Sequence, residues 1–539
     1  MSTKQKSVTR KNNDNNNAVP ADAVRQDAIN KALWSVCDTF RGTISADTYK
    51  DFILTMLFLK YISDVWQDHY DDYKKKHGDE PELIDALMKT ERFVIPEGSS
   101  FYDLYARRHE PHNGDRIDTA LHAIEEANGS KLHSPGKSVF QDIIFNTHKL
   151  GDEKQKNGIL RHVLEDFAKP ELNLKPSRVG KLDVIGNAYE YLIGRFAAQS
   201  GQKAGEYYTP PEVSELLAEL LDPKPGESIC DPACGSGSLL MKCGRKVREH
   251  FNNDKTYKLY GQEAIGDTWA LAKMNFFLHS EDNHKVEWGD TLRSPQLIDD
   301  KGNLMLFDIV TANPPFSLDK WGHDDAEHDP YGRFARGIPP KTKGDYAFIL
   351  HMIETMNPKT GRMGVVVPHG VLFRGSAEGR IRQKLIEENL LDAVIGLPEK
   401  LFYGTGIPAA ILVFRRNRNT ENVVFIDASR EFEAGKNQNK LSDENIRNIV
   451  AVYQKALKAH TLKGTEGKVL KDKYAYLATK HEIAANDFNL NIPRYVDTFE
   501  EEEEIDLMAV RAERMALKQE LMSLEERMEG YLKELGYGS

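Results

Sequence analysis

The feature that most constrains the fold is an alternation of short apolar runs with helix-length segments, which begins near Gly205. The apolar runs are short enough to be strands. They lie at residues 228–230, 258–260, 285–288, 307–311, 363–367, 393–396 and 410–414. Because strands that alternate with helices usually pair in one direction, the sequence predicts an α/β fold with a parallel or mostly parallel sheet.

The segments around this sheet have other patterns. Residues 1–21 include an Asn-rich run and lack the apolar core of a signal peptide, so we expect a disordered tail. Residues 22–195 carry apolar side chains three and four positions apart, which predicts a helical N-terminal domain. The sheet would occupy residues 196–495. Residues 496–539 form the last segment, in which apolar residues from Leu507 to Leu535 follow a heptad rhythm. This rhythm predicts a long amphipathic helix, packed either on its own domain or on another subunit.

The composition narrows the classes of protein that fit. With 539 residues the chain exceeds the size of a single core. Its longest apolar run, residues 52–62, contains Lys60 and falls short of the roughly 20 residues that cross a bilayer, so we expect a cytoplasmic protein without membrane contact. The 4 cysteines lack the spacing of metal ligands, which predicts reduced thiols and no metal site. At a net charge of −11, DNA binding would need local basic clusters or a partner chain.

A glycine-rich turn follows the first predicted strand and precedes a helix. Its candidate ligand-binding residues are Asp231, Gly235, Ser236, Gly237 and Ser238. Glycines let a ligand approach the backbone closely, and the N–H groups at a helix start point toward it. The opening Asp suits a cationic or amino-bearing ligand, such as the methionine part of a sulfonium cofactor. A purely structural turn is the alternative.

Two further acids follow the next predicted strands. Glu263 closes the second strand, where a carboxylate can accept hydrogen bonds from both ribose hydroxyls of an adenosine. Asp290 follows the third strand and can lie beside the adenine amino group. Either acid alone could be a solvated surface residue. With Asp231 they occupy three successive strand ends, where ligands bind in open α/β sheets.

The fourth predicted strand runs into the candidate catalytic residues Asn313, Pro314, Pro315 and Phe316. The two prolines stiffen the loop and lack N–H groups of their own. The Asn313 side-chain oxygen and the Pro314 carbonyl can accept two hydrogen bonds from one amino group, and Phe316 can stack on a flipped base. This pattern predicts attack of an exocyclic amine on a methyl sulfonium. A turn that only ends the strand is the alternative.

A second motif lies upstream of the first strand and comprises Glu206, Tyr207, Tyr208, Thr209, Pro210 and Pro211. These residues can wall the cofactor pocket from the other side. Thr209 can instead serve only as the N-cap of a helix that begins at Pro210.

Taken in order, these motifs resemble those of DNA amino-methyltransferases and, more narrowly, those of the methylation subunit of type I restriction–modification systems. Residues 343–348, 367–375 and 401–408 are also similar to later motifs of that family. The resemblance implies a Rossmann-like methyltransferase sheet, S-adenosyl-L-methionine as cofactor and N6 of adenine as the methylated atom. It places the cofactor on residues 207–211 and 236–238 and on Glu263, and the adenine on residues 313–316.

The resemblance also implies partners. In the family, a separate specificity subunit recognises the DNA sequence, two methylation subunits surround it, and a restriction and translocation subunit cleaves the double-stranded DNA. No basic helix or zinc finger that could read a major groove stands out in this chain, so its target sequence cannot be predicted. Arg333, Arg336, Lys341 and Lys343 either contact phosphates or form a solvated loop.

Several weaker signals remain. His369 could be a base, but a loop residue after the fifth strand is the simpler interpretation. Residues 136–138, Gly-Lys-Ser, lack the first glycine of a phosphate-binding loop, so we do not expect ATP hydrolysis. Two other functions stay open. The Asn-Pro-Pro loop would also suit methylation of a glutamine amide in a protein, and the chain could be a non-catalytic scaffold.

Overall fold

The computed structural model describes residues 26–41, 44–78, 80–132, 136–179, 184–199, 209–402, 406–436, 438–459, 467–498 and 507–537. The chain forms two compact units, Met1–Val496 and Asp497–Ser539, which are treated separately. The expected tail and the candidate residues Glu206, Tyr207 and Tyr208 lie outside the described residues.

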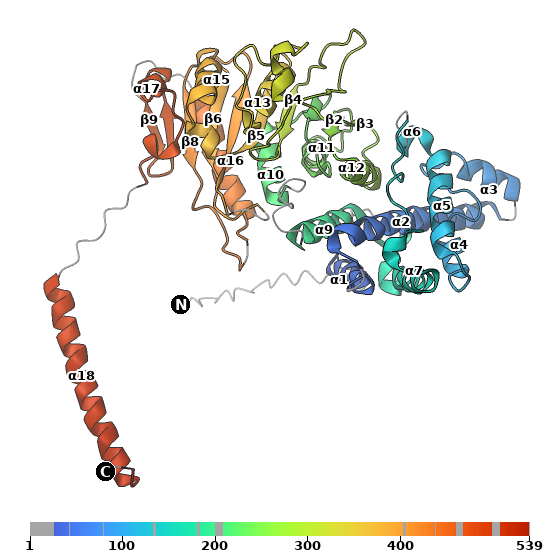
Figure 1. Ribbon diagram of the computed structural model, residues 1–539, viewed down its shortest axis with the longest axis horizontal. Helices are drawn as coiled ribbons and strands as arrows, with labels where there is room; N and C mark the ends of the chain where they lie inside the picture. Colours follow the sequence, from blue (N-terminus) through green and yellow to red (C-terminus); the bar gives the residue numbers. More distant parts are fainter. Residues whose placement is uncertain are drawn as a thin grey trace, which may run out of the picture. The chain divides into compact units, whose positions relative to one another are not determined.

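A sheet of 10 strands forms the centre of the first unit, in the order β3-β2-β1-β4-β5-β7-β6-β8-β10-β9 (Figure 1). The five strands from β3 to β5 are parallel, and β7 runs antiparallel between β5 and β6. β6 and β8 are parallel, whereas β10 and β9 extend the edge in antiparallel fashion. The strands are β1 Ser228–Asp231, β2 Lys258–Glu263, β3 His284–Trp288, β4 Ile309–Ala312, β5 Arg362–Pro368, β6 Leu391–Gly396, β7 Ala409–Arg415, β8 Val423–Asp427, β9 Lys468–Lys471 and β10 Ala475–Ala478.

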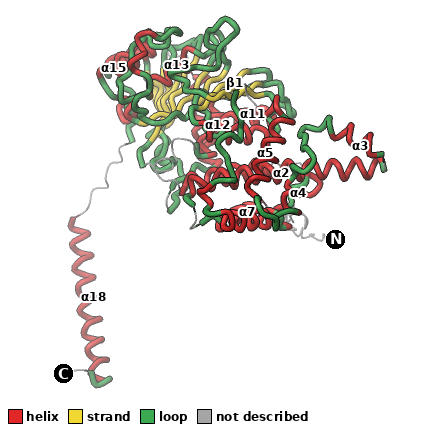
Figure 2. The backbone as a smooth tube through the Cα atoms, turned by 45° about the vertical axis from the view of Figure 1, so that its right-hand side comes forward, coloured by secondary structure: helices red, strands yellow, loops and turns green. Residues whose placement is uncertain are grey.

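Helices cover both faces of this sheet, so its central strands are apolar on both sides. Side chains of α10 and α16 share a core with one face of β5, β6 and β7, and those of α13 and α15 share a core with the other. Figure 2 shows α13 and α15 on one side of the strands and α11 and α12 on the other. The helices are α10 Pro211–Leu221, α11 Ser238–His250, α12 Gly266–Leu278, α13 Asp345–Glu354, α14 Gly370–Phe373, α15 Ser376–Glu387, α16 Asp443–Ala459 and α17 Lys480–Ala485.

The region before the sheet is helical, and it packs on α12 beside the β3 edge. One apolar core runs through both parts. Phe93 lies against Phe277 with ring centroids 4.4 Å apart, and Arg92 donates to the Phe277 carbonyl at 2.7 Å. The helices are α1 Gln26–Val36, α2 Ala46–His77, α3 Pro81–Met88, α4 Phe101–Ala106, α5 Asn113–Ala127, α6 Gly129–Leu132, α7 Glu153–Phe167, α8 Pro176–Val179 and α9 Val184–Gln199.

The predicted α/β class is confirmed, with two differences in the strands. β4 begins at Ile309 rather than at Phe307, because Phe307 pairs with Met356 in an isolated bridge. β8, β9 and β10 have no counterpart among the predicted strands. They make the second half of the sheet mixed, whereas the half that carries the motifs is parallel.

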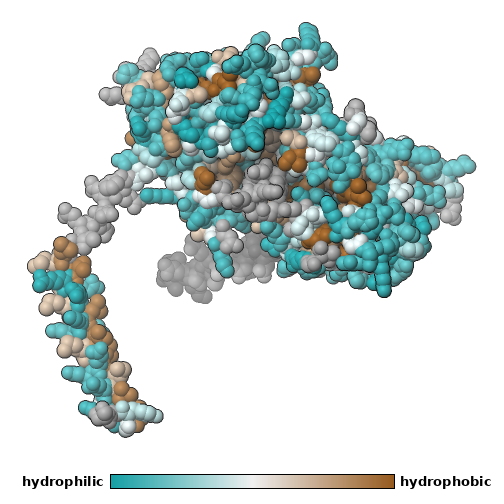
Figure 3. All heavy atoms as spheres, viewed as in Figure 1, coloured by the Kyte–Doolittle hydropathy of each residue, from teal (hydrophilic) through white to brown (hydrophobic). Residues whose placement is uncertain are grey.

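The second unit contains α18, Leu507–Glu534. Apolar side chains recur along its length and are visible in Figure 3. Among the described residues, no helix combines the length and the apolar content needed to cross a membrane.

Candidate active site

The glycine-rich turn connects β1 to α11 in a conformation that requires its glycines. Gly235 and Gly237 have φ angles of 53° and 80°, in the left-handed region. A Cβ atom on Gly237 would lie 2.6 Å from Cε2 of Phe276. α11 begins at Ser238, whose hydroxyl lies 2.9 Å from that of Ser236. The turn therefore brings both hydroxyls to the start of a helix.

Asp231 and Glu263 are buried carboxyl groups at the ends of β1 and β2. The two Glu263 oxygens accept the N–H groups of Gly235 and Ile265, each at 2.9 Å, and Asp231 accepts the N–H of Ala233. Burial raises the pKa of Asp231 to about 8 and also raises the pKa of Glu263. Neither pairs with a cation among the described residues. Two such carboxyl groups suit a ligand that brings a positive charge and hydroxyl groups.

Asp290 is more exposed than the other two acids. One carboxylate oxygen accepts the N–H groups of Leu292 and Arg293, which closes a turn after β3. Gln262 holds this turn by donating to the Gly289 carbonyl at 2.9 Å. Thr291 ties the turn to the glycine loop by donating to the Pro232 carbonyl. The structure therefore joins the ends of β1, β2 and β3, as expected for a ligand crevice.

Asn313 follows β4 and is 9% exposed. Its Nδ2 donates to Thr209 Oγ1 at 3.2 Å, whereas its Oδ1 has no hydrogen-bond partner among the described residues. A buried oxygen without a partner carries a free-energy cost, which a donor from a substrate would remove. Pro314 is also buried, and Pro315 and Phe316 are partly exposed.

Phe316 and the residue that follows it are both held by contacts with other segments. Its ring meets the ring of Phe402 edge to face, at a centroid distance of 5.7 Å and an angle of 65°. The following N–H, of Ser317, donates to Asp345 Oδ1 at 2.8 Å, and Arg374 donates to Asp345 Oδ2 at 2.6 Å. The loop is thus fixed at its end as well as by its prolines.

The capping interpretation of Thr209 is wrong. α10 begins at Pro211, its N-cap is Pro210, and no side chain caps it. The Thr209 hydroxyl faces Asn313 instead.

Neither of the two alternatives left open for Arg333 and Arg336, phosphate contact or a solvated loop, fits their surroundings. Arg333 is buried, pairs with Asp329 at 2.7 Å and donates to the Thr291 and Leu292 carbonyls. Arg336 pairs with Glu354 and Glu388. Both guanidinium groups are therefore engaged in holding the loop.

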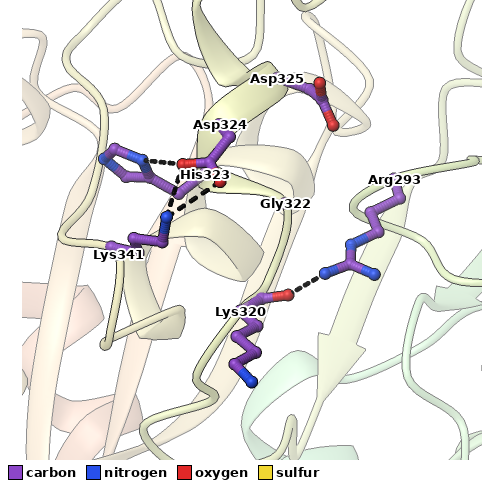
Figure 4. Close-up of a pocket in the computed structure, with 7 residues that line it drawn as sticks. All are labelled: Arg293, Lys320, Gly322, His323, Asp324, Asp325 and Lys341. Carbon is purple, nitrogen blue, oxygen red and sulfur yellow. Dashed lines mark hydrogen bonds and ion pairs between the residues drawn. The ribbon is translucent and has the colours of Figure 1, made fainter.

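Lys341 lines a cavity of about 390 Å³ in the same loop, together with Arg293 and Lys320 (Figure 4). Lys341 Nζ lies 2.9 Å from both carboxylate oxygens of Asp324, and Arg293 donates to the Lys320 carbonyl. Because Asp324 and Asp325 also line the cavity, its charge is mixed.

Two motifs have structural roles. His369 follows β5 and contacts the Ala409 carbonyl at 3.2 Å, as expected of a loop residue. Lys137 donates to the Trp288 carbonyl at 2.5 Å, so this Gly-Lys-Ser segment links the helical region to the end of β3. All 4 cysteines are free and buried.

Sequence reasoning missed residues that orient the site. Asn275 of α12 donates to the Ser236 carbonyl at 3.0 Å, and Gln262 holds the turn after β3. Neither carries a local signal, because each acts on a segment distant in sequence. Asp345 and Phe402 fall within segments that the family resemblance singled out, but without a role.

Comparisons with known proteins agree with this geometry. The family described as N-6 DNA Methylase matches residues 180–504, and the HsdM N-terminal domain matches residues 29–167. The MjaVIII methylase subunit of a type I restriction enzyme from Methanocaldococcus jannaschii is 33% identical over 90% of this chain and 81% of its own length. The MpnII methylase subunit from Mycoplasma pneumoniae is 29% identical, over 90% and 92%. The type I methyltransferase subunit from Streptococcus thermophilus superposes with a TM-score of 0.75 at 34% identity, covering 88% of this chain and 100% of that one.

The sheet, with its three acidic strand ends and the Asn-Pro-Pro-Phe loop after β4, is that of a methyltransferase. The chain belongs to the N-6 DNA methylase family, as a methylase subunit of the type I restriction enzymes. It is an adenine-N6-specific DNA methyltransferase subunit, and this function is supported over glutamine-amide methylation and over a scaffold.

Proposed function

We propose that the residues gathered at the ends of β1, β2 and β3 bind S-adenosylmethionine. Asp231 would face the amino group of the methionine part, and Glu263 the ribose hydroxyls. Gly235, Ser236, Gly237 and Ser238 would approach through the turn, and Asp290 would lie near the adenine. Residues 206–211 would form the opposite wall, of which Thr209, Pro210 and Pro211 are described. The burial of the Asp231 and Glu263 carboxyl groups, without a cationic side chain beside them among the described residues, supports this assignment.

The bound cofactor would supply a methyl group on a sulfonium. The chain's own residues would present N6 of an adenine flipped out of double-stranded DNA. Asn313 Oδ1 and the Pro314 carbonyl would each accept one N–H of the amino group and so direct the nitrogen lone pair toward the methyl group. Phe316 would stack on the base, with Phe402 against its edge. The proton released after transfer can pass to water.

The observation that carries this proposal is the Asn313 amide. Its buried oxygen has no hydrogen-bond partner in the described ranges, and it lies at the start of a loop that two prolines and Asp345 hold in place. An acceptor fixed before the substrate arrives needs little reorganisation when charge develops on the amine.

The test is transfer of tritium from labelled S-adenosylmethionine to unmethylated genomic DNA by the chain co-expressed with its specificity subunit. Asn313→Ala should lower transfer by about 10²–10³-fold, as for loss of one preorganised hydrogen bond, while the cofactor Kd changes little. Phe316→Ala should weaken capture of the base by about 1–3 kcal/mol. Unchanged turnover by the Asn313 variant would refute the assigned role.

The proposed partners are the specificity subunit, a second copy of this chain, the restriction and translocation subunit, and DNA in the cytoplasm. Relatives named as subunits of type I restriction enzymes support action within a complex. The net charge of −11 leaves much of the basic surface for DNA to a partner. The division into a tail (1–21), a helical domain (22–195), a catalytic domain (196–495) and an assembly helix (496–539) stays a prediction.

A further inference from the structure

The Thr209 hydroxyl is not used by the helix that follows it. Pro210 and Pro211 come directly after Thr209 and have no N–H groups. The first backbone bonds of α10 run from Val213 and Ser214 to the Pro210 carbonyl, and no side chain caps the helix. The double proline therefore leaves this hydroxyl available for a contact outside α10.

That contact is with the Asn313 side chain, 104 positions along the chain. The Asn313 Nδ2 group donates to Thr209 Oγ1 at 3.2 Å. The opposite end of the same amide, Oδ1, is buried and has no hydrogen-bond partner in the part of the chain that the structure describes. Because an amide is planar, a contact that holds Nδ2 on one side directs Oδ1 to the other.

We propose that Thr209 is a positioning residue for the methyl transfer, because its hydroxyl holds the Asn313 amide with the oxygen toward the amino group of adenine. Without this hydroxyl, the Asn313 amide can turn about its last side-chain bond. Its N–H groups would then face the N–H groups of the adenine, and two sets of donors repel one another. This inference rests on the role proposed for Asn313. It assigns the Thr209 hydroxyl to the catalytic loop, whereas the rest of Thr209 can still line the proposed cofactor pocket.

An orienting role for the Thr209 hydroxyl and a role in the cofactor wall have different effects on methyl transfer and on cofactor binding. If the hydroxyl orients Asn313, its loss slows methyl transfer and leaves the affinity for S-adenosylmethionine intact. If Thr209 instead contacts the cofactor, its loss raises the cofactor Kd. If only the methyl group of Thr209 matters, through packing, Val preserves function and Ser does not.

The experiment compares Thr209→Val, which is nearly isosteric and lacks the hydroxyl, with Thr209→Ser, which keeps it. Thr311→Val is the matched control, because Thr311 lies on β4 two positions before Asn313 and its buried hydroxyl has no hydrogen-bond partner among the residues described. Each variant is co-expressed with the specificity subunit. The measurements are the single-turnover transfer rate to unmethylated genomic DNA and the Kd for S-adenosylmethionine by equilibrium dialysis.

We expect the single-turnover rate to fall by about 10–100-fold in Thr209→Val, less than the roughly 10²–10³-fold for direct loss of one preorganised hydrogen bond, because Asn313 itself remains. The cofactor Kd should stay within about threefold, and Thr209→Ser and Thr311→Val should transfer at close to the wild-type rate. Wild-type transfer by Thr209→Val would overturn the inference, as would equal losses in the Val and Ser variants or a loss confined to the cofactor Kd. An inactive Asn313→Ala beside a fully active Thr209→Val would overturn this inference alone, whereas an active Asn313→Ala would overturn the proposed function.

Discussion

At the scale of single residues, the most unusual group is Asp231. It is 2% exposed, and the Ala233 N–H is its hydrogen-bond donor. Burial raises its pKa to about 8, above the value of about 4 that an Asp has in an unfolded chain. The folded, ligand-free protein therefore binds this proton more tightly than the unfolded chain does, and its stability falls as pH rises from about 4 through 8.

The same carboxyl group should make cofactor affinity depend on pH. If the ionised form of Asp231 binds the amino group of S-adenosylmethionine, binding below pH 8 must first remove its proton. The affinity should then rise by at most about tenfold per pH unit from pH 6 toward 8. It should fall again above about pH 8, where the amino group of the ligand, with an ordinary pKa of about 7.7–8.0, loses its charge. Calorimetric titrations at pH 6, 7, 8 and 9 measure this dependence. Asp231→Asn should bind more weakly and lose most of the slope, so a variant with the wild-type slope would contradict the assignment.

The residues that sequence could predict are those whose role is local. Asn313 and the glycine turn follow predicted strands directly, and the structure places them at strand ends. The partner of Asn313 could not be predicted, because Thr209 meets it only after β1 and β4 have paired in the sheet. The burial of Arg333 could not be predicted for a related reason. Whether a cation in a loop is exposed depends on how the loop packs, and here Arg333 forms a buried ion pair with Asp329.

At the scale of elements, the connection from β1 to α11 depends on one glycine. Gly237→Ala would put a side chain in a left-handed conformation and 2.6 Å from Phe276. The expected loss is about 2–4 kcal/mol, from the conformational cost and the overpacking together. Urea denaturation without cofactor measures it.

The matched control for this substitution is Gly158→Ala, within α7, where no atom lies within 4 Å of an added Cβ. It should stabilise the protein by about 0.5–1 kcal/mol, because Ala favours a helix interior. Equal effects of the two substitutions would show that crowding and φ at position 237 do not limit this turn.

The strands differ in how strongly their own residues predict them. β5, β6 and β7 are buried on both faces and appear in the sequence as continuous apolar runs. β9 is mostly exposed and forms only because β10 offers it an edge to pair with. Such a strand is specified by its neighbour, so its own residues carry little signal.

At the scale of the whole molecule, Arg92 joins the helical region to the sheet. Its guanidinium donates to the Phe277 carbonyl, to Ser280 and to Asp282, and it lies 4.8 Å from the Phe93 ring. Arg92→Ala should lower the free energy of unfolding by about 2–3 kcal/mol, the usual cost of hydrogen bonds made by a charged group.

Arg107→Ala is the control for Arg92→Ala, because Arg107 forms an exposed ion pair with Glu110 on the surface. It should cost less than about 1 kcal/mol. Both are measured by urea denaturation of the isolated chain. A loss at Arg92 no larger than at Arg107 would mean that the shared apolar core alone holds the two parts together.

The second unit, Asp497–Ser539, contains the helix α18. Within this unit α18 is the one described helix, and apolar side chains, Leu517, Leu521 and Leu524 among them, are exposed along one side of it. A stripe of this length is typical of a helix that packs against another chain. Changing Leu517, Leu521 and Leu524 to Glu should therefore abolish co-purification with the specificity subunit and leave the cofactor Kd unchanged, since Met1–Val496 is compact without α18. The control places the same three charges on the opposite side of the helix, at Ala512, Gln519 and Ser523. Since both variants add equal negative charge, loss of assembly in both would point to charge rather than to the stripe, and assembly in both would remove α18 from the interface.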